Sequence, residues 1–331
     1  MTTSLSATAM TLLDWGKRLD PNGKVAAVIE LLAQTNQMLP EMMVKEGNLP
    51  TGERTTIRTG LPTAYWRMFN QYVATSKSTT AQVTEDCGML EAWSSTDKDL
   101  AELGGNLNAW RLSEAAPFVE AMNQEMQDTV IYGNGGTAPS EFTGLSVRYS
   151  SLSAANADNI IAAGGAGNDN YSIWLVVWGE NTCFTVFPKG SKAGLVHENL
   201  GLTTVTDSNG AKMRAYEDRF QWKLGLVLKD WRYAVRVANI DVSALVAKSG
   251  AADLTECLIK ATYRIPNLDA GKPAFYMNRT CAEFLDIQRR DDVSSGGGLN
   301  YEVVDGKRIM KFRGIPIRIV DRLVTETTAV T

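Results

Sequence analysis

Apolar side chains recur at helical spacing between residues 107 and 132. Spacings of three and four residues place them on one stripe of a helix. The positions on this stripe are Leu112, Ala115, Val119, Met122, Met126 and Val130. Pro117 is expected near the start of the helix, where the first turn tolerates a proline. Because methionine packs readily into irregular cores, the stripe indicates a buried face rather than a cofactor site.

The first 45 residues predict two short helices joined by a turn. Apolar positions over 5–20 have helical spacing, and Asp20 to Gly23 is typical of a turn. A second helical pattern follows over 25–32, and Pro40 ends it. The two helices share no core of their own, so we expect them to form an arm that lies on another surface.

Residues 47–75 predict a projecting two-stranded loop. Alternating β-forming and charged residues over 53–59 are bounded by glycine and proline on both sides. Because an isolated hairpin is marginal in water, we expect it to rest on another chain. A hairpin that packs on its own domain is the alternative. Residues 80–85 predict a further strand, which is expected to run into a helical stretch ending near residue 92.

The second half of the chain alternates between strand and helix patterns. The predicted strands are 171–178, 182–187, 213–217, 220–228, 233–237 and 275–278, and the predicted helices are 242–248, 251–263 and 279–290. Gly179 to Asn181 indicates a hairpin between the first two of these strands. Asp253 is expected to cap the helix that follows it.

Glycine and proline mark the remaining turns. Two strands are expected around Gly314 within 309–321, with Pro316 at an edge or a bulge. The glycine-rich segments 150–170 and 294–299 are expected to be surface turns, since neither carries a Gly-Lys-Ser/Thr or GxGxxG phosphate-binding motif.

Composition indicates a folded protein of one large or two modest domains. The chain has 331 residues, is 44% hydrophobic and 21% charged, and has a net charge of −4 with a pI near 5.3. This balance argues against nucleic acid as the main ligand, because phosphate binding needs a concentrated positive face.

Cysteine and histidine usage restricts the chemistry. Cys87, Cys183, Cys257 and Cys281 form no CxxC pair, so we expect reduced, mostly buried thiols. The lone histidine, His197, is expected in a loop rather than in a metal or acid–base site. The opening residues lack the basic and apolar regions of a signal peptide, so synthesis without secretion is expected.

The sequence carries no recognised catalytic motif. It has no GxSxG elbow, HExxH pair or EF-hand loop. Acidic pairs such as Asp97 with Asp99 lie in polar stretches that favour solvation. The segment 289–292 is expected to bind an anion or to pair with itself or with a neighbouring subunit. Residues 229–233 form the one basic and aromatic cluster, which Asp230 dilutes. We therefore predict no catalytic, cofactor-binding or metal residue and no cofactor.

Three segments, in this order, resemble a known family. They are Val130 to Thr137 with Phe142 to Leu145, then Ala274 to Thr280, then Phe312 to Ile317 with Ile319 to Asp321. Together they resemble the glycine turn, the Met-Asn strand and the terminal Gly-x-Pro strand of major capsid proteins of tailed bacteriophages with the Hong Kong 97-like fold, podovirus type. The turn reads Gly-Asn-Gly where the family often has Gly-Asp-Gly. No Lys/Asn pair can be carried over as a crosslink.

This resemblance implies an α+β capsid fold, and a rearranged strand order is an alternative within it. The implied organisation is an N-terminal arm, 1–45, an extended loop, 46–78, a peripheral domain, 79–170, with a spine helix at 107–132, an axial domain, 171–270, and an axial helix with a return to the peripheral domain, 271–331.

The resemblance also implies a function. It predicts a non-enzymatic head protein, made in the bacterial host cytoplasm, that self-assembles as hexamers and pentamers into the icosahedral virion shell. Implied partners are a cement or decoration protein, a scaffold and a portal, with indirect contact to packaged double-stranded DNA and no membrane. The alternatives are an α+β hydrolase with an unrecognised carboxylate site and a solitary binding module.

Overall fold

A computed structural model describes residues 34–103, 106–206, 210, 212–248, 250, 252–291, 299–304 and 307–331. The two helices expected within the first 33 residues lie outside the described residues, as does nearly all of the turn expected at 294–299.

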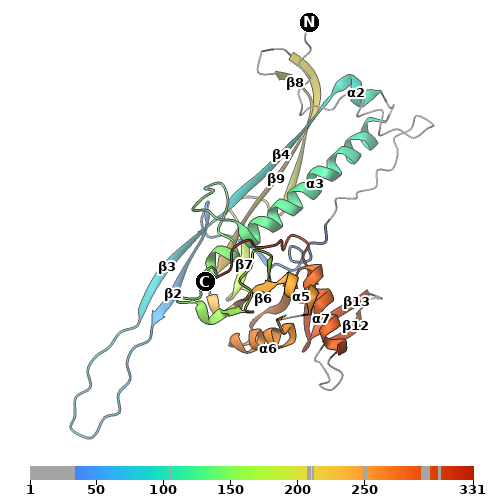
Figure 1. The fold of residues 1–331 in the computed structure, drawn as a ribbon. Helices are drawn as coiled ribbons and strands as arrows, with labels where there is room; N and C mark the ends of the chain where they lie inside the picture. Colours follow the sequence, from blue (N-terminus) through green and yellow to red (C-terminus); the bar gives the residue numbers. More distant parts are fainter. Residues whose placement is uncertain are drawn as a thin grey trace.

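Helix α3 (Leu107–Tyr132) and a three-stranded ribbon form one elongated end of the molecule. The helix lies along the ribbon, in which β9 pairs antiparallel with both of its neighbours (Figure 1). The three strands are β4 (Gly88–Asp97), β8 (Leu195–Thr206) and β9 (Lys212–Leu228). A short helix, α2 (Lys98–Glu102), links β4 toward α3, and the Asp97 side chain caps it. The bounds of α3 confirm the helix that apolar spacing predicts. The expectation that its whole apolar stripe is buried was wrong, because Leu112 and Val119 are exposed while Met122, Met126 and Val130 are buried.

Pro117 lies inside α3 rather than in its first turn. The helix begins ten residues earlier, at Leu107. Proline has no N–H, so it cannot donate the usual helical hydrogen bond to the Ser113 carbonyl. The expectation of a proline near the helix start was therefore wrong.

The body of the molecule is built on a mixed sheet. Its central strand, β6 (Asn170–Trp178), pairs antiparallel with β10 on one edge and with β11 on the other. The sheet continues through β14 and β13 to β12, while β5 joins it at β10. These strands are β5 (Ile160–Ala162), β10 (Ala234–Asp241), β11 (Lys272–Met277), β12 (Leu299–Val304), β13 (Lys307–Phe312) and β14 (Ile315–Ile319).

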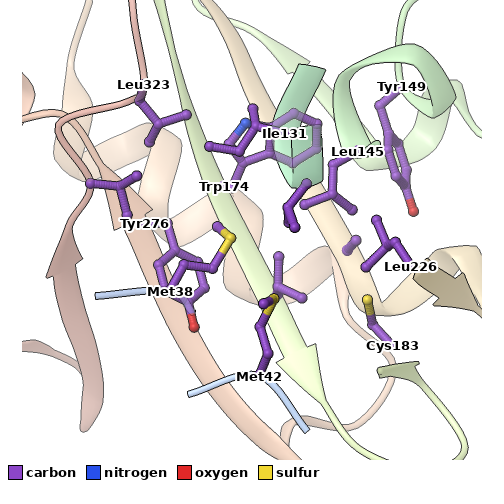
Figure 2. Packing of buried hydrophobic residues seen from close by; sticks show 14 of the residues in the cluster. Met38, Met42, Ile131, Leu145, Tyr149, Trp174, Cys183, Leu226, Tyr276 and Leu323 are labelled. Carbon is purple, nitrogen blue, oxygen red and sulfur yellow. The ribbon is translucent and has the colours of Figure 1, made fainter. Parts of the chain in front are cut away.

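Two hydrophobic cores lie on opposite faces of β6. Strand side chains alternate between faces, so Ile173, Leu175 and Val177 join one cluster, and Trp174, Val176 and Trp178 join the other. Helices α5 (Val242–Ala247), α6 (Leu254–Arg264) and α7 (Arg279–Asp291) cover the first face. The second face packs against the C-terminal end of α3 and against Met38 and Met42 (Figure 2).

Short elements complete the fold. The connecting segments contain α4 (Leu145–Arg148) and the 3-10 turns η1 (Ala157–Asn159), η2 (Trp231–Tyr233) and η3 (Leu268–Ala270). The Asp253 carboxylate accepts a hydrogen bond from the Glu256 amide at 2.9 Å, which confirms the expected helix cap. Within α7, Leu285 is buried, and Phe284 is partly buried against the same core.

The hairpin expected around Gly179 to Asn181 is wrong. Strand β7 (Cys183–Phe187) meets β6 only at Trp178 and Cys183, in a parallel bridge. Both edges of β6 are already occupied by β10 and β11. The chain therefore turns away, and β7 pairs antiparallel with β9 and parallel with β1 (Val44–Glu46).

Three further expectations are corrected by strand pairing. Residues 88–92 belong to β4 rather than to a helix, because the whole strand pairs with β9. The break expected near residue 218 is absent, since β9 continues through Asp218. Strand β14, which contains Pro316, lies between β13 and β11 rather than at an edge. Pro316 precedes the β11 ladder, which begins at Ile317, so its missing N–H is tolerated there.

Candidate assembly interface

A long hairpin projects from the molecule at the end opposite the α3 arm (Figure 1). Strands β2 (Gly52–Gly60) and β3 (Thr79–Asp86) pair antiparallel from Gly52 with Asp86 outward to Gly60 with Thr79. Threonine, valine and isoleucine favour the extended backbone. The hairpin is longer than the expected loop at 46–78, because its return strand is 79–86.

The tip of the hairpin, residues 61–78, exposes a cluster of large apolar side chains. Trp66, Phe69 and Tyr72 expose 104%, 96% and 103% of their reference surface. The other exposed apolar members of the tip are Leu61, Tyr65, Met68 and Val73. A monomeric protein rarely leaves a contiguous patch of this kind in water, so the tip has the character of an interaction surface.

A tight turn forms the apex of the tip. The Gln71 amide donates to the Met68 carbonyl at 3.3 Å, and Asn70 adopts a left-handed backbone with φ of 64°. Asparagine tolerates this conformation better than most residues. Phe69 and Asn70 are therefore the two central residues of this turn.

Buried charges fix the base of the hairpin. The Arg148 guanidinium donates to Glu85 on β3 and also to the carbonyls of Thr143 and Leu226. The Glu53 carboxylate on β2 accepts from the Asn48 amide at 2.7 Å. Both carboxylates lie on strands of the hairpin while their donors belong to the body. The hairpin is thus held at its base and free at its tip.

Two glycines allow the chain segments at this base to approach closely. A Cβ on Gly52 would lie 2.0 Å from the Glu85 carbonyl oxygen, and one on Gly225 would lie 2.7 Å from the Asp86 carbonyl oxygen. No side chain fits at either position without backbone movement. Hairpin strands and β9 therefore meet through backbone contact.

One charged cluster and one aromatic stack connect α3 to strands β8 and β9 at the other end of the molecule. Arg111 on α3 donates to both oxygens of Asp218 on β9, at 2.7 and 3.1 Å. His197 on β8 lies 2.9 Å from the same carboxylate and stacks on Phe220, with ring centroids 4.8 Å apart. Phe118 on α3 also stacks on Phe220, with ring centroids 5.9 Å apart. His197 is thus a strand residue that couples the ribbon, rather than the expected loop residue.

The other residues considered for chemistry have structural roles. Asp97 caps α2. Asp230 pairs with Arg232 within its own turn. The side chains of residues 289–292 lie outside the described part of the chain. Among the described residues, no group of three or more His, Cys, Asp and Glu side chains is placed to hold a metal ion.

Burial raises the pKa of the cysteine thiols, to about 12 for Cys183 and Cys281. Cysteine reacts as its thiolate, so these thiols have the character of packing residues rather than nucleophiles. No described helix is both long and apolar enough to cross a membrane.

The three sequence segments that carry the family resemblance meet in one place. Strands β11 and β14 lie side by side in parallel, with Phe275 opposite Ile317. The glycine turn closes through a 2.8 Å hydrogen bond from the Gly144 amide to the Gly133 carbonyl. Side chains from all three segments then share one core, which contains Val130, Ile131, Phe142, Leu145, Ala274, Tyr276 and Val320 (Figure 2).

Sequence reasoning found the hairpin but missed its tip. The signal was present between Gly60 and Thr79, where aromatic and apolar residues gather without a single acid. A loop normally carries polar residues, so this composition indicates a partner surface.

Comparisons with known proteins place the chain among capsid proteins. A family model described as major capsid protein GP7 matches residues 20–331. A chain in the near-atomic-resolution structure of bacteriophage epsilon15 is 34% identical, with a TM-score of 0.80, and the match covers 99% of this chain and 100% of that one. No curated protein matches the sequence.

More distant similarities have lower scores. The capsid of an empty GTA particle is 11% identical, with a TM-score of 0.41 over 70% of this chain and 99% of that one. The capsid of Myoviridae phage XM1 is 10% identical, with a TM-score of 0.41 over 65% and 95%. We draw nothing further from these two.

Proposed function

This chain belongs to the major capsid protein GP7 family of tailed bacteriophages, and on that basis we propose that its hairpin tip joins each copy to a neighbour in an icosahedral shell around double-stranded DNA. The chain has the α+β, Hong Kong 97-like fold expected from its motifs. Family and fold imply a structural rather than an enzymatic role, and they support the capsid reading over the hydrolase alternative.

The exposed tip is the observation that carries this proposal. Trp66, Phe69 and Tyr72 lie almost wholly in water, and burying one such side chain contributes roughly 1.5–3 kcal/mol. The anchored base and the outward direction of the hairpin keep the tip away from its own body (Figure 1). A second copy therefore supplies the surface that covers it.

A modest contact between two copies is sufficient for a stable shell, because the shell repeats that contact many times. In a closed symmetric assembly every subunit makes the same contacts, so weak interfaces add up to a stable shell. We propose hexamers and pentamers as the units, and cement or decoration, scaffold and portal proteins as further partners. Synthesis in the host cytoplasm and indirect contact with packaged DNA complete the proposal, and the net charge of −4 supports indirect contact.

The family organisation maps onto the molecule as follows. We assign the extended loop to the hairpin 52–86, the peripheral domain to α3 with β4, β8 and β9, and the axial domain to the sheet around β6 with α5 to α7. Pairing of β8 and β9 with β4 supports grouping 195–228 with the peripheral domain instead of with the axial domain. We assign the start of the chain to the arm, while Met38 and Met42, which lie within the expected arm 1–45, pack in the core of the body.

Assembly of the purified chain tests the proposed function. Mass photometry over a concentration series and negative-stain electron microscopy are expected to show rings of five or six subunits, or closed shells. A monomer that stays monomeric at the highest soluble concentration would contradict the proposal.

A further inference from the structure

We propose that Asn134, in the glycine turn after α3, is a site of self-modification, at which the side-chain amide is lost through a cyclic imide formed with Gly135. Both residues are partly exposed, and Gly136 and Thr137 beside them are exposed, so water reaches the turn. Glycine has no Cβ to hinder its own backbone nitrogen when that nitrogen approaches the preceding side chain. This chemistry belongs to the single chain and does not depend on assembly.

The reaction needs only water and base. The Gly135 backbone nitrogen loses its proton and bonds to Cγ of Asn134, while the bond from Cγ to the side-chain nitrogen breaks and that nitrogen leaves as ammonia. Water then opens the five-membered imide at one of its two carbonyl carbons. Opening at Cγ gives aspartate on an ordinary backbone. Opening at the main-chain carbonyl gives isoaspartate, whose backbone runs through Cβ and Cγ.

The nucleophile and the leaving group are both free of hydrogen bonds. The Asn134 carbonyl accepts from the Thr137 amide at 3.1 Å and from the Ala138 amide at 2.8 Å, so Asn134 begins a short helical turn. The first amides of such a turn have no partner within it. Within the described part of the chain, nothing accepts from the Gly135 amide or from Asn134 Nδ2. Attack and departure therefore break no hydrogen bond.

The turn also activates the carbon that is attacked. The Gly136 amide donates a hydrogen bond to Asn134 Oδ1 at 3.0 Å. Addition of the Gly135 nitrogen to Cγ places negative charge on this oxygen, and a backbone N–H that already points at it stabilises that charge. The same bond keeps the side chain folded back over the Gly135 backbone.

Three other asparagines make the same side-chain turn without a following glycine. In each, Oδ1 accepts from the amide two residues later, at 2.8 to 3.0 Å, and leucine or arginine comes next; they are Asn199, Asn267 and Asn278. Asn199 and Asn267 are more exposed than Asn134, so access of water does not distinguish them. The residue that follows is the difference, which makes them matched internal controls. Asn22 and Asn209 also precede glycine, but both lie outside the described residues.

The two products are expected to affect the turn differently. Aspartate keeps an oxygen that accepts from the Gly136 amide and adds one negative charge. Isoaspartate lengthens the backbone inside a turn whose ends are joined by the 2.8 Å hydrogen bond from the Gly144 amide to the Gly133 carbonyl. The isoaspartyl form is therefore expected to unfold at lower urea concentration than the aspartyl form.

Peptide mass spectrometry of the incubated full chain tests the proposal. The folded protein is kept at neutral and at mildly alkaline pH, and each asparagine is followed for conversion of amide to acid, with isoaspartate identified by electron-transfer fragmentation. Conversion at Asn134 is expected to increase with time and with pH, while Asn199, Asn267 and Asn278 keep their amides. The chain in denaturant shows that the assay detects the reaction. Conversion of Asn134 in denaturant but not in the folded protein would overturn the proposal, because the turn would then protect the site.

Two alanine variants separate the attacking residue from its neighbour. Neither Gly135 nor Gly136 has a left-handed backbone, and a Cβ at either position has its nearest contact at 3.2 Å, so both variants are expected to fold. Gly135→Ala places a Cβ beside the attacking nitrogen and is expected to slow conversion of Asn134 at least severalfold. Gly136→Ala keeps the donating N–H and is expected to leave the rate near that of the wild type. Equal rates for Gly135→Ala and the wild type, or equal slowing in both variants, would overturn the assignment.

Discussion

Arg148 and Glu85 form two parallel hydrogen bonds, from Nη1 to Oε1 at 2.5 Å and from Nη2 to Oε2 at 2.7 Å. Both side chains are largely buried. We predict that Arg148→Leu lowers the free energy of unfolding by about 3–5 kcal/mol, because it leaves the Glu85 charge buried and unpaired. Urea unfolding of the disassembled subunit measures the loss. Arg232→Leu, which breaks an exposed pair with Asp230, is the control and is expected to cost less than about 1 kcal/mol. Similar losses in both variants would argue against a structural role for the buried pair.

The glycine turn after α3 predicts that two glycine-to-alanine substitutions differ in how far they lower the stability of the protein. A Cβ on Gly133 would lie 2.5 Å from the Thr129 carbonyl oxygen and 2.6 Å from that of Phe142. Gly133→Ala is therefore expected to destabilise the protein by about 1–3 kcal/mol. At Gly136 the nearest atom is a side-chain oxygen of Asn134 at 3.2 Å. Gly136→Ala is expected to have a much smaller effect on the thermal midpoint, and a reversed order would refute this account of the turn.

Glu91 predicts a dependence of stability on acid pH. Hydrogen bonds from Arg219, and then from Trp93 and Gln221, lower the pKa of its carboxyl from 4.5 to about 2. A lowered pKa contributes stability that is present above pH 4.5 and is lost as the pH falls toward 2. The wild-type protein is expected to lose this component between pH 5 and pH 2, whereas Glu91→Gln lacks it at every pH, as measured by urea unfolding at each pH. Identical pH profiles for both proteins would show that the interaction adds nothing.

Thiol reactivity is expected to follow burial. The pKa of Cys183 and Cys281 is raised to about 12, and that of Cys87 and Cys257 to about 11. Cys87 is the one that is partly exposed. At pH 8 we expect slow labelling by a thiol reagent, with Cys87 reacting first, and rapid labelling of every cysteine in denaturant. Fast reaction of Cys183 in the native protein would contradict the described core.

Several elements of the fold could be predicted because helical spacing and helix caps depend only on residues that are close together in the sequence. The stripe from Leu112 to Val130 predicted α3, and the Asp253 cap predicted the start of α6. The strand β8 was missed because its polar alternation resembles a loop until β9 is known to pair with it. The direction of β7 was also beyond local reasoning, since it depends on β10 and β11 occupying both edges of β6.

The interface was predicted only in part for the same reason. Glycine and proline around residues 47–62 indicated a projecting loop, and the α+β capsid fold that the motifs implied is confirmed. The return strand at 79–86 was not predicted to belong to the hairpin. Its partner β2 ends at Gly60, so the whole tip, residues 61–78, separates the two strands in the sequence. Exposure of Trp66, Phe69 and Tyr72 is a property of the tertiary structure, and it turns a loop into a candidate contact surface.

Replacement of Trp66, Phe69 and Tyr72 by serine tests the central claim most directly. Since these side chains touch solvent rather than the core, the triple variant is expected to keep the thermal midpoint of the wild-type subunit. Assembly state at matched concentration is then read by mass photometry and negative-stain electron microscopy. The account predicts folded subunits that form neither rings nor shells, whereas shells of normal size and yield from the triple variant would contradict it.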